Sequence, residues 1–328
     1  MSAHAYDLRI DDRRPPSEDI LDVVRRGLRS TPKRLPSWLF YDERGSALFE
    51  RICEQPEYYL TRAECALMAC HGASVAATLG ADVRLVEYGS GSALKTDILL
   101  QQLASPVAYV PVEISPEPLM ASVQRLAARY PQVPMQPLCA DFTRPLRLPI
   151  PPRAARRTVL YFPGSTIGNF ESREAVKLLR KMRSEMGENG GILVGVDLKK
   201  DVARLEAAYN DAAGVTAEFT LNMLVRLNRE LGCDFDLRHF RHRAHYNAMA
   251  GRIETNIVAV MPQTVSLGRE TVTFQADEAM QVEYSCKYSL ADFAVLAGQA
   301  GLEVRSVWTD PDGWFSLQYL TRSAPVAP

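Results

Sequence analysis

The chain has 328 residues, of which 47% are hydrophobic and 23% are charged, and its formal net charge is −1. This balance is typical of a globular chain long enough for one large or two ordinary domains, and it argues against a nucleic-acid or membrane-surface partner. No apolar run approaches the roughly 18 residues of a membrane-spanning helix.

The amino-terminal residues and the cysteines indicate the cellular compartment. Met1 to Pro16 carry acidic residues and arginines but no apolar core, so we do not expect a signal peptide. None of the six cysteines belongs to a Cys-x-x-Cys pair, which argues against a zinc site or a redox motif. These features predict reduced thiols in a cytoplasmic protein without a bound metal. We also expect a monomer.

The residues before the first strand are expected to be mainly helical. An aromatic patch, Trp38–Tyr41, precedes a short helical pattern, and another helical pattern follows Pro56. In the latter, Thr61 and Glu64 have the spacing of a capping box. The adjacent pair Tyr58-Tyr59 is most simply interpreted as packing residues, although loops next to a scaffold carry functional side chains disproportionately.

A glycine turn follows the first predicted strand. The apolar run that begins at Val83 ends in Glu87-Tyr88, and Gly89-Ser90-Gly91 and a helical pattern come next. Glycines let the backbone bend sharply and approach a ligand, and the helix directs its first amides at the same place. This layout predicts the first strand and helix of an open parallel sheet with a nucleotide-like ligand. The third glycine of the dinucleotide fingerprint is missing, so NAD binding is weakly supported.

From about residue 83, strands and helices alternate. The predicted strands are Val83–Tyr88, Val107–Ile114, Pro137–Phe142, Thr158–Phe162 and Ile192–Asp197. Helical patterns at Pro116–Tyr130 and Ser172–Met186 lie between them. This alternation predicts an α/β fold with a largely parallel sheet.

The alternation stops near Leu198. Residues 200–232 are helical in pattern, and residues 241–287 show the two-residue alternation of antiparallel strands. The α/β pattern resumes with a helix from Ser289 and ends in a hairpin, Leu302–Thr309 with Trp314–Thr321.

We therefore expect two domains. Residues 1–198 and 287–328 would form the α/β domain, and residues 199–286 would be an inserted α+β domain that binds the substrate.

Acidic residues stand at the ends of successive predicted strands: Glu87, Glu113, Asp141 and Asp197. Ligands of open α/β sheets bind at these carboxyl ends. Glu113 follows Gly89 by 24 residues, near the roughly 20 expected for an acid that binds ribose hydroxyls. Asp141-Phe142 would bind an adenine amino group and stack on its ring. Any one of these acids is most simply a solvated loop carboxylate, but together they favour an adenosine pocket.

Two cofactors fit an adenosine pocket, a nicotinamide dinucleotide and S-adenosylmethionine. A dinucleotide needs close phosphate approach, which the missing third glycine disfavours, whereas S-adenosylmethionine has no phosphate. The closing helix, strand, turn and strand resemble the seven-stranded class I methyltransferase (Rossmann-like) fold, whose last strand runs antiparallel. These features favour S-adenosylmethionine as the co-substrate.

Five segments, taken together, carry a more specific resemblance. They are Leu39–Ser46, Pro56–Arg62, Gly164–Asn169, Asp211–Thr216 and Glu283–Lys287. Their combination resembles the histidine Nα-methyltransferase family of ergothioneine biosynthesis, over about residues 20 to 322. The resemblance implies S-adenosylmethionine-dependent trimethylation of the α-amino group of L-histidine, which gives hercynine.

The resemblance also implies two sets of binding residues. The cofactor-binding residues would be Gly89, Lys95, Glu113, Asp141 and Phe142, with Lys95 at the methionine carboxylate. The substrate-binding residues would be Tyr58 and Asn169 around the amine and carboxylate, Tyr209 at the carboxylate, Thr216 nearby, and Glu283 and Ser285 at the imidazole. Tyr58 and Asn169 would be the catalytic residues, with the Tyr58 hydroxyl helping to remove the proton of the amine.

The chemistry of an imidazole fits this assignment. A carboxylate that takes one ring N–H and a hydroxyl that serves the other nitrogen recognise it specifically. Without the family resemblance, Glu283 and Ser285 would be interpreted as one solvated face of an alternating strand. The transfer itself needs mainly alignment, because a sulfonium carries an activated methyl group and the amine only has to be neutral.

One position departs from the family pattern. The family has methionine after Ile-Glu, whereas this sequence has Ile253-Glu254-Thr255. The smaller Thr255 predicts a roomier imidazole pocket, but Glu283 and Ser285 keep histidine as the expected substrate. The alternative is an N-methyltransferase that acts on another amino acid or a small amine.

Other interpretations have less support. His239, His242 and His245 resemble a metal cluster, but they would not converge on a strand or a helix, and arginines lie among them. A nicotinamide-dependent oxidoreductase lacks the third glycine. A module that senses the cofactor without turnover is not excluded by the sequence.

Overall fold

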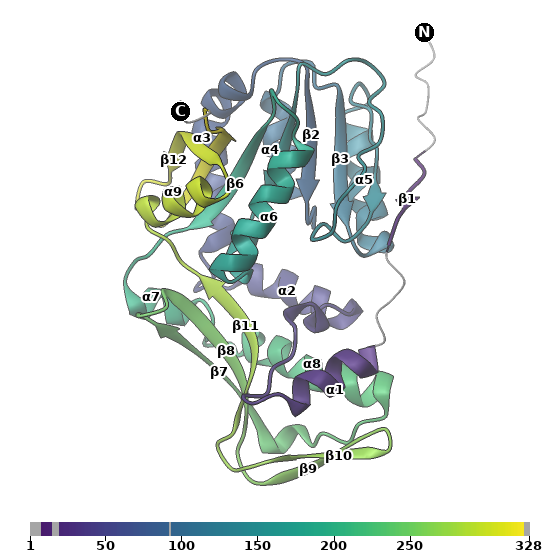
Figure 1. Cartoon of the computed structure of the whole chain (residues 1–328), viewed down its shortest axis with the longest axis vertical. Helices are drawn as coiled ribbons and strands as arrows, with labels where there is room; N and C mark the ends of the chain where they lie inside the picture. Colours follow the sequence, from purple (N-terminus) through teal and green to yellow (C-terminus); the bar gives the residue numbers. More distant parts are fainter. Residues whose placement is uncertain (1–7, 15–19, 92, 325–328) are drawn as a thin grey trace. The chain divides into compact units, whose positions relative to one another are not determined.

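The computed structural model describes residues 8–14, 20–91 and 93–324. The chain forms two compact units (Figure 1). The sheet unit contains Met1–Pro16, Arg62–Leu198 and Tyr288–Pro328, and the second unit contains Ser17–Thr61 and Lys199–Lys287. Part of the segment tested for a signal peptide lies outside the described residues. Within the described ranges, no helix is both long and apolar enough to cross a membrane.

The sheet unit is built on an eight-stranded sheet. In spatial order the strands are β1 (Asp11–Asp12), β4 (Leu138–Cys139), β3 (Ala108–Glu113), β2 (Val83–Tyr88), β5 (Arg157–Phe162), β6 (Gly191–Asp197), β13 (Phe315–Arg322) and β12 (Leu302–Thr309). Neighbouring strands from β1 to β6 run parallel, whereas β13 runs antiparallel to both β6 and β12. Beyond the two-residue β1, this confirms the expected class I methyltransferase fold with its antiparallel last strand.

Helices cover both faces of this sheet (Figure 1). On one face, α3 (Leu60–Leu79), α4 (Leu94–Gln102) and α5 (Pro116–Arg129) share an apolar core with the strands. On the other face lie α6 (Ser172–Glu185) and α9 (Leu290–Gln299). Every residue of β2 is buried. Coverage of both faces explains why the central strands are almost continuously apolar in the sequence.

The carboxyl ends of the central strands meet at one edge of the sheet. Glu87 of β2 lies beside Pro111 of β3 and Tyr161 of β5. The loops after these three strands therefore emerge together, where open α/β sheets bind their ligands. At the same end, the Tyr288 amide donates to the Asp197 carbonyl at 3.2 Å. The residues that precede and follow 199–287 thus lie side by side within the sheet unit.

The second unit combines helices with a small antiparallel sheet. Its helices are α1 (Ile20–Arg29), η1 (Ser37–Phe40), α2 (Glu43–Glu54), α7 (Val202–Ala207), α8 (Val215–Leu231) and η3 (Leu237–His239). Its sheet has the order β11 (Ala279–Cys286), β8 (Arg252–Ala259), β7 (Phe240–Asn247). A separate hairpin is formed by β9 (Gln263–Leu267) and β10 (Glu270–Phe274).

Residues Ser17–Thr61 belong to the second unit, although the sequence analysis grouped them with residues 1–198. Three interactions within that unit explain the difference. The Leu35 amide donates to the Gln281 carbonyl at 2.9 Å, Arg29 pairs with Glu270 at 2.6 Å, and α2 packs against α8. Pairings over such sequence separations leave no local pattern in the sequence.

Most elements begin and end close to the predicted positions. β7 begins at Phe240, one residue before the predicted run of antiparallel strands. Its register with β8 runs without a break from Phe240 opposite Ala259 to Asn247 opposite Arg252. The partner strand β8 therefore pairs with β7 along its whole length.

Candidate active site

The loop between β2 and α4 is a tight left-handed turn. Gly89 has a φ of +71° and Gly91 a φ of +43°, a region that glycine enters without steric cost. Ala93 follows at a φ of +57°, where a side chain costs roughly 1–2 kcal/mol. The Gly89 amide donates to the Val112 carbonyl of β3 at 2.9 Å. Strained backbone of this kind concentrates at binding sites.

Glu87 supports the loop from inside the sheet. Its carboxylate accepts the Thr96 hydroxyl at 2.6 Å and also the Tyr109 hydroxyl. Burial raises the pKa of Glu87 to about 7, and the hydrogen bonds from Thr96 and Tyr109 only partly offset this. Glu87 therefore braces the first turn of α4 and differs from the strand-end acids that the sequence analysis grouped with it.

Two further residues predicted to bind the cofactor lie next to this loop. A Cβ atom placed on Gly89 would lie 3.9 Å from the Phe142 ring. That ring stacks on Tyr88, with centroids 5.6 Å apart and planes 17° apart. Glu113 ends β3 and accepts the Ile114 amide at 2.8 Å, and burial raises its pKa. The structure thus brings Gly89, Glu113 and Phe142 to one edge of the sheet.

Asp141 follows β4 and is held by its own loop. One oxygen accepts the Thr143 amide at 2.8 Å, and the other lies 3.3 Å from the Arg144 guanidinium. These contacts hold the carboxylate of Asp141, the residue that directly precedes Phe142 in the sequence. Its predicted bond to an adenine amino group stays a prediction.

Lys95 pairs with a carboxylate that the sequence analysis did not assign to the site. Its Nζ lies 2.7 Å from Oε2 of Glu64, a side chain that is 0% exposed. The same oxygen accepts the Gly164 amide at 2.9 Å. The capping-box prediction for Thr61 and Glu64 is wrong, because α3 begins at Leu60 and the Glu64 side chain binds Lys95. Glu64 therefore joins α4 to the turn after β5.

The turn after β5 is a second strained segment at this edge. Gly164 has a φ of +74° and Ser165 a φ of +56°. The Ser165 hydroxyl accepts the Asp197 amide at 2.9 Å, which ties the end of β5 to the end of β6. The turn leads into η2 (Thr166–Asn169), where Asn169 is exposed.

The residues around the glycine loop fit S-adenosylmethionine. The Ser90 hydroxyl is buried and has no hydrogen-bond partner among the described residues, and such a group normally binds a ligand or water. Among the predicted cofactor-binding residues, Glu113 would supply an acceptor for ribose hydroxyls, Phe142 an aromatic face and Lys95 a cation. Within the described ranges, no three His, Cys, Asp or Glu side chains converge on a potential metal position.

In the second unit, the aromatic rings of Tyr58 and Tyr209 are in contact. Their centroids are 6.3 Å apart in an edge-to-face arrangement. Burial raises the pKa of Tyr58 well above its ordinary value, and Tyr209 adds to the shift. The Tyr58 hydroxyl is therefore a neutral phenol near neutral pH. It can exchange hydrogen bonds with an amine, but it is not an ionised base.

Tyr209, Ser285 and Lys287 form a buried triangle of polar atoms. The Tyr209 hydroxyl lies 2.8 Å from the Ser285 hydroxyl. The Lys287 ammonium donates to Tyr209 at 2.8 Å and to Ser285 at 2.9 Å. Lys287 is only 2% exposed. Lys287 ends the segment Glu283–Lys287 that carries the family resemblance, but the sequence gave it no predicted role.

Glu283 and Thr255 face each other across two strands. They are directly paired in the register of β11 and β8. Burial raises the pKa of Glu283 to about 7, although the charge of Lys287 opposes the shift. Thr255 is 1% exposed, so the position at which the family resemblance fails is an interior one.

Thr216 lies at the start of α8 and is fixed by Asp211. The Asp211 carboxylate accepts the Val215 and Thr216 amides, each at 2.7 Å. Burial would raise the pKa of Asp211, but hydrogen bonds from Thr216 and Val215 lower it overall. The segment Asp211–Thr216 is therefore a helix cap, and a direct role for Thr216 in substrate binding stays a prediction.

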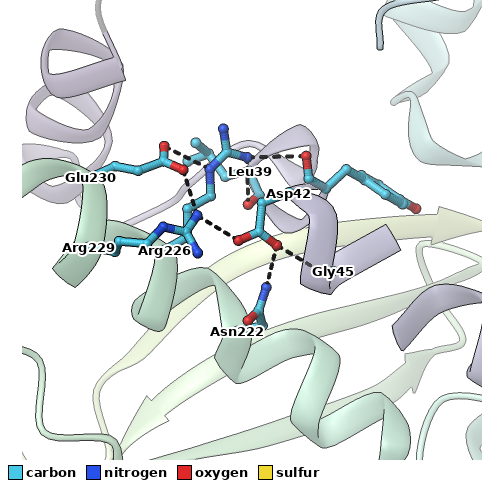
Figure 2. Close-up of polar contacts among 8 residues, drawn as sticks. Leu39, Asp42, Gly45, Asn222, Arg226, Arg229 and Glu230 are labelled. Carbon is cyan, nitrogen blue, oxygen red and sulfur yellow. Dashed lines mark hydrogen bonds and ion pairs between the residues drawn. The ribbon is translucent and has the colours of Figure 1, made fainter. Parts of the chain in front are cut away.

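The segment Leu39–Ser46 is a structural joint. Figure 2 shows the Asp42 carboxylate accepting hydrogen bonds from the Gly45 amide at 2.7 Å, from Asn222 at 2.8 Å and from Arg229 at 2.8 Å. Asp42 thus caps α2 and binds it to α8. A Cβ atom on Gly45 would lie 1.8 Å from the Phe40 carbonyl oxygen, so only glycine fits there.

This joint supports Tyr58 through a series of aromatic contacts. Phe219 of α8 lies 6.0 Å from Phe49 of α2, and Phe49 lies 6.2 Å from Tyr58, measured between ring centroids. Tyr58 is then in contact with Tyr209. The position of the predicted catalytic tyrosine therefore depends on how α2 and α8 are joined.

The three histidines of the apparent metal motif have separate protein neighbours. His242 lies 3.0 Å from the Thr220 hydroxyl and 2.8 Å from the Tyr209 carbonyl, and burial lowers its pKa. His239 contacts Gln263 at 3.3 Å, and His245 lies 3.8 Å from Glu254. His242 and His245 belong to β7 and His239 to η3, and among the described residues the three side chains do not share a common polar neighbour.

An open cavity of about 460 Å³ lies elsewhere in the sheet unit. It is lined by Arg156, Arg157, Glu188, Asn189, Gly190, Tyr319, Thr321 and Arg322. These residues stand at the starts of β5 and β6 and at the end of β13. The cavity is therefore at the opposite end of the strands from the glycine loop.

Comparison with known proteins gives a consistent result. Residues 20–322 match the family described as "Histidine-specific methyltransferase, SAM-dependent". A "Histidine N-alpha-methyltransferase" of Mycobacterium tuberculosis is 40% identical over 90% of this chain and 92% of its own length. One with the same name from Mycolicibacterium smegmatis is 38% identical over 91% of this chain and 94% of its own length. A "4-dimethylallyltryptophan N-methyltransferase" of Aspergillus fumigatus is 30% identical over 89% of this chain and 91% of its own length.

Proposed function

The chain belongs to the histidine-specific, S-adenosylmethionine-dependent methyltransferase family, and from this premise we propose that it trimethylates the α-amino group of L-histidine to hercynine in ergothioneine biosynthesis. One structural observation carries the choice of substrate. Glu283 and Ser285 are two residues apart on β11, so a carboxylate and a hydroxyl share one face of the strand. An imidazole, with one N–H and one acceptor nitrogen, satisfies both groups.

Each transfer replaces one proton on the α-nitrogen by a methyl group. When bound, S-adenosylmethionine supplies an activated methyl group on its sulfonium. The amine has to lose a proton before each transfer, so the conversion of histidine to hercynine releases three protons. The neutral Tyr58 hydroxyl accepts a hydrogen bond from the amine and directs the nitrogen lone pair. Alignment of this kind is the main contribution that a protein makes to such a reaction.

The sheet unit supplies the residues for the co-substrate. Glu113 accepts from ribose hydroxyls, Asp141 from the adenine amino group, and Phe142 packs on the adenine ring. Lys95, whose Nζ lies 2.7 Å from the Glu64 carboxylate, is assigned to the methionine carboxylate. Asn169 is assigned to the substrate amine and carboxylate.

A competition experiment tests the proposal. The purified protein is incubated with S-adenosylmethionine and an equimolar mixture of the twenty amino acids, and products are identified by mass spectrometry. The expected result is a gain of three methyl groups on histidine and on no other amino acid. Methylation of a different amino acid would overturn the choice of substrate, and absence of any methylated product would favour a module that only senses the cofactor.

Thr255 motivates the alternative, an enzyme for another amino acid or amine. Thr255 is 1% exposed and lies opposite Glu283, so its size limits the space beside the proposed imidazole. The Aspergillus fumigatus relative, which is matched over 91% of its own length, is named for a tryptophan derivative. Thr255→Met should lower kcat/KM for tryptophan relative to histidine. If wild type turns over tryptophan as fast as histidine, the alternative is correct.

We further infer a monomer that acts in the cytoplasm on small molecules and not on nucleic acid. The net charge of −1 offers no electrostatic attraction to phosphates, and the cysteines are free thiols. Light scattering coupled to size exclusion should give the mass of a single chain. A dimer at micromolar concentration would contradict this inference.

A further inference from the structure

The hydroxyl of Ser285 is surrounded by donors. Lys287 donates to it at 2.9 Å, and the Tyr209 hydroxyl lies 2.8 Å away. All three side chains are buried, with exposed fractions of 2% for Lys287, 7% for Tyr209 and 4% for Ser285. An ammonium group has hydrogens to give and no lone pair. Lys287 therefore donates a hydrogen bond to one lone pair of each of the two hydroxyl oxygens that it contacts.

The bond between the two hydroxyls has a preferred direction. A phenol is a stronger acid and a poorer acceptor than an alkyl hydroxyl, so Tyr209 donates and Ser285 accepts. A serine hydroxyl has two lone pairs and one hydrogen. With one lone pair bound to Lys287 and the other to Tyr209, Ser285 can only donate to a fourth group.

We propose that Lys287 is a specificity-determining positioning residue: by occupying Ser285 as an acceptor, it makes this serine a dedicated hydrogen donor that selects the neutral imidazole ring of histidine. The proposal rests on the proposed function, namely that histidine binds at Glu283 and Ser285. The unprotonated ring nitrogen accepts from Ser285, and the ring N–H donates to Glu283. An imidazolium, which has two N–H groups and no acceptor nitrogen, would leave the Ser285 hydrogen unpaired, and an unpaired buried donor is costly.

The same arrangement changes the expected role of Tyr209. With the direction inferred above, its hydrogen points to Ser285, and one of its lone pairs accepts from Lys287. Tyr209 is then not available as the donor to the substrate carboxylate that the sequence resemblance implies. It acts instead by directing Ser285.

The test uses rings that differ in one nitrogen. Thiazolylalanine has an acceptor nitrogen and no ring N–H, and its two isomers place that nitrogen at either imidazole position. Thienylalanine has neither group. With wild type, one thiazolylalanine isomer should exceed thienylalanine in kcat/KM by about tenfold, the value of one buried hydrogen bond. In Lys287→Met the advantage should fall to near unity, and Tyr209→Phe should reduce it in part.

Controls separate this proposal from its premise and from misfolding. Lys177→Met removes an exposed lysine of α6 and should leave the ratio unchanged. Lys287→Gln keeps an amide NH₂ group that can donate to Ser285. It should therefore restore part of the kcat/KM advantage of thiazolylalanine over thienylalanine. If Lys287→Met does not fold, Lys287→Gln and Tyr209→Phe still decide the outcome.

Two results would overturn the proposal while leaving histidine methylation intact. One is a wild-type enzyme that methylates histidine but treats both thiazole isomers and the thiophene alike. The other is a thiazole advantage that persists in Lys287→Met. A wild-type enzyme that does not methylate histidine at all would instead refute the proposed function.

Discussion

Burial controls the protonation of the two side chains on which the proposed reaction most depends. It raises the pKa of Tyr58 well above the ordinary value for a phenol and the pKa of Glu283 to about 7. Tyr58 therefore acts as a neutral hydrogen-bonding group, whereas Glu283 gains or loses its charge near neutral pH. These two states lead to different tests.

Removing the Tyr58 hydroxyl tests its role at the amine. Tyr58→Phe should lower kcat for the first methylation by about tenfold, because one hydrogen bond made in the transition state is lost. Single-turnover kinetics with mass detection measure this rate. The matched control is Tyr59→Phe, because the Tyr59 hydroxyl accepts from Lys200 at 2.7 Å and has no assigned role at the amine. Equal rates for wild type and Tyr58→Phe would exclude both a positioning and a proton-accepting role.

The pH dependence of histidine turnover tests Glu283. Below pH 7 its carboxyl group is mostly protonated and cannot accept the ring N–H as a carboxylate does. The ratio of kcat/KM for wild type to that for Glu283→Gln should rise about tenfold from pH 6 to pH 8. The histidine ring titrates equally in both reactions and cancels in the ratio.

Glu254→Gln is the control for this measurement, because Glu254 is the neighbour of Thr255 on β8 and its side chain binds Arg252 at 2.9 Å. Its ratio to wild type should not change with pH. A pH-independent ratio for Glu283→Gln would show that this carboxylate does not bind the substrate ring.

Two carboxylates, those of Asp42 and Glu87, hold secondary-structure elements together and are not assigned to ligand binding. Asp42 joins the start of α2 to α8, and Glu87 joins the end of β2 to α4. Their pKa values move in opposite directions. Burial alone would raise the pKa of Asp42, but the Gly45 amide, Arg229 and Asn222 lower it, whereas burial of Glu87 prevails.

Asp42→Ala should destabilise the second unit. It removes a helix cap and leaves Asn222, which is 1% exposed, without its acceptor. The expected loss is about 2–3 kcal/mol in the free energy of unfolding at pH 7, measured with urea. The Asp42 pKa is lowered in the folded state, so its contribution is lost as pH falls and the difference from Asp42→Ala should shrink in acid.

Asp22→Ala provides the comparison for Asp42, since the Asp22 side chain is 53% exposed and pairs with Arg25 on the same helix. It should cost less than about 0.5 kcal/mol. Equal losses for the two variants would contradict the role assigned to the joint.

Glu87→Gln tests the brace below the glycine loop. The pKa of Glu87 is about 7 in the folded protein and 4.5 in the unfolded chain, so the folded state binds its proton more tightly. The free energy of unfolding therefore falls as pH rises from 4.5 to about 7. The free energy of unfolding of wild type should decrease by up to about 3 kcal/mol over this range from Glu87 alone. Glu87→Gln should show a smaller decrease, while Glu303→Gln, at a partly exposed position of β12, should keep the wild-type slope.

The sequence predicted the elements better than the contacts between them. Strand and helix periodicity located β2, β5 and the closing hairpin, and the strand ends located Gly89 and Glu113. The partner of Lys95 could not be predicted, because Glu64 lies on a different helix and only folding brings the two together. Lys287 was missed for the same reason, since its burial depends on Tyr209 rather than on its own strand.

At the scale of the whole molecule, the predicted binding residues divide between the two units. The residues assigned to the co-substrate, and also Asn169, belong to the sheet unit, whereas Tyr58, Tyr209, Thr255, Glu283 and Ser285 belong to the second unit. The residues proposed to hold the methyl donor thus belong to the sheet unit, and most of those proposed to select the amino acid belong to the second unit. Family membership over residues 20–322 includes both units.

The central claim is that this chain places three methyl groups on the α-nitrogen of histidine. The most direct measurement is incubation of histidine with S-adenosylmethionine carrying an isotope-labelled methyl group, followed by nuclear magnetic resonance of the product. The account predicts one product with three equivalent labelled methyl groups bonded to the α-nitrogen and an unmodified ring. Label on a ring nitrogen, or a final product that keeps an N–H on the α-nitrogen, would contradict it.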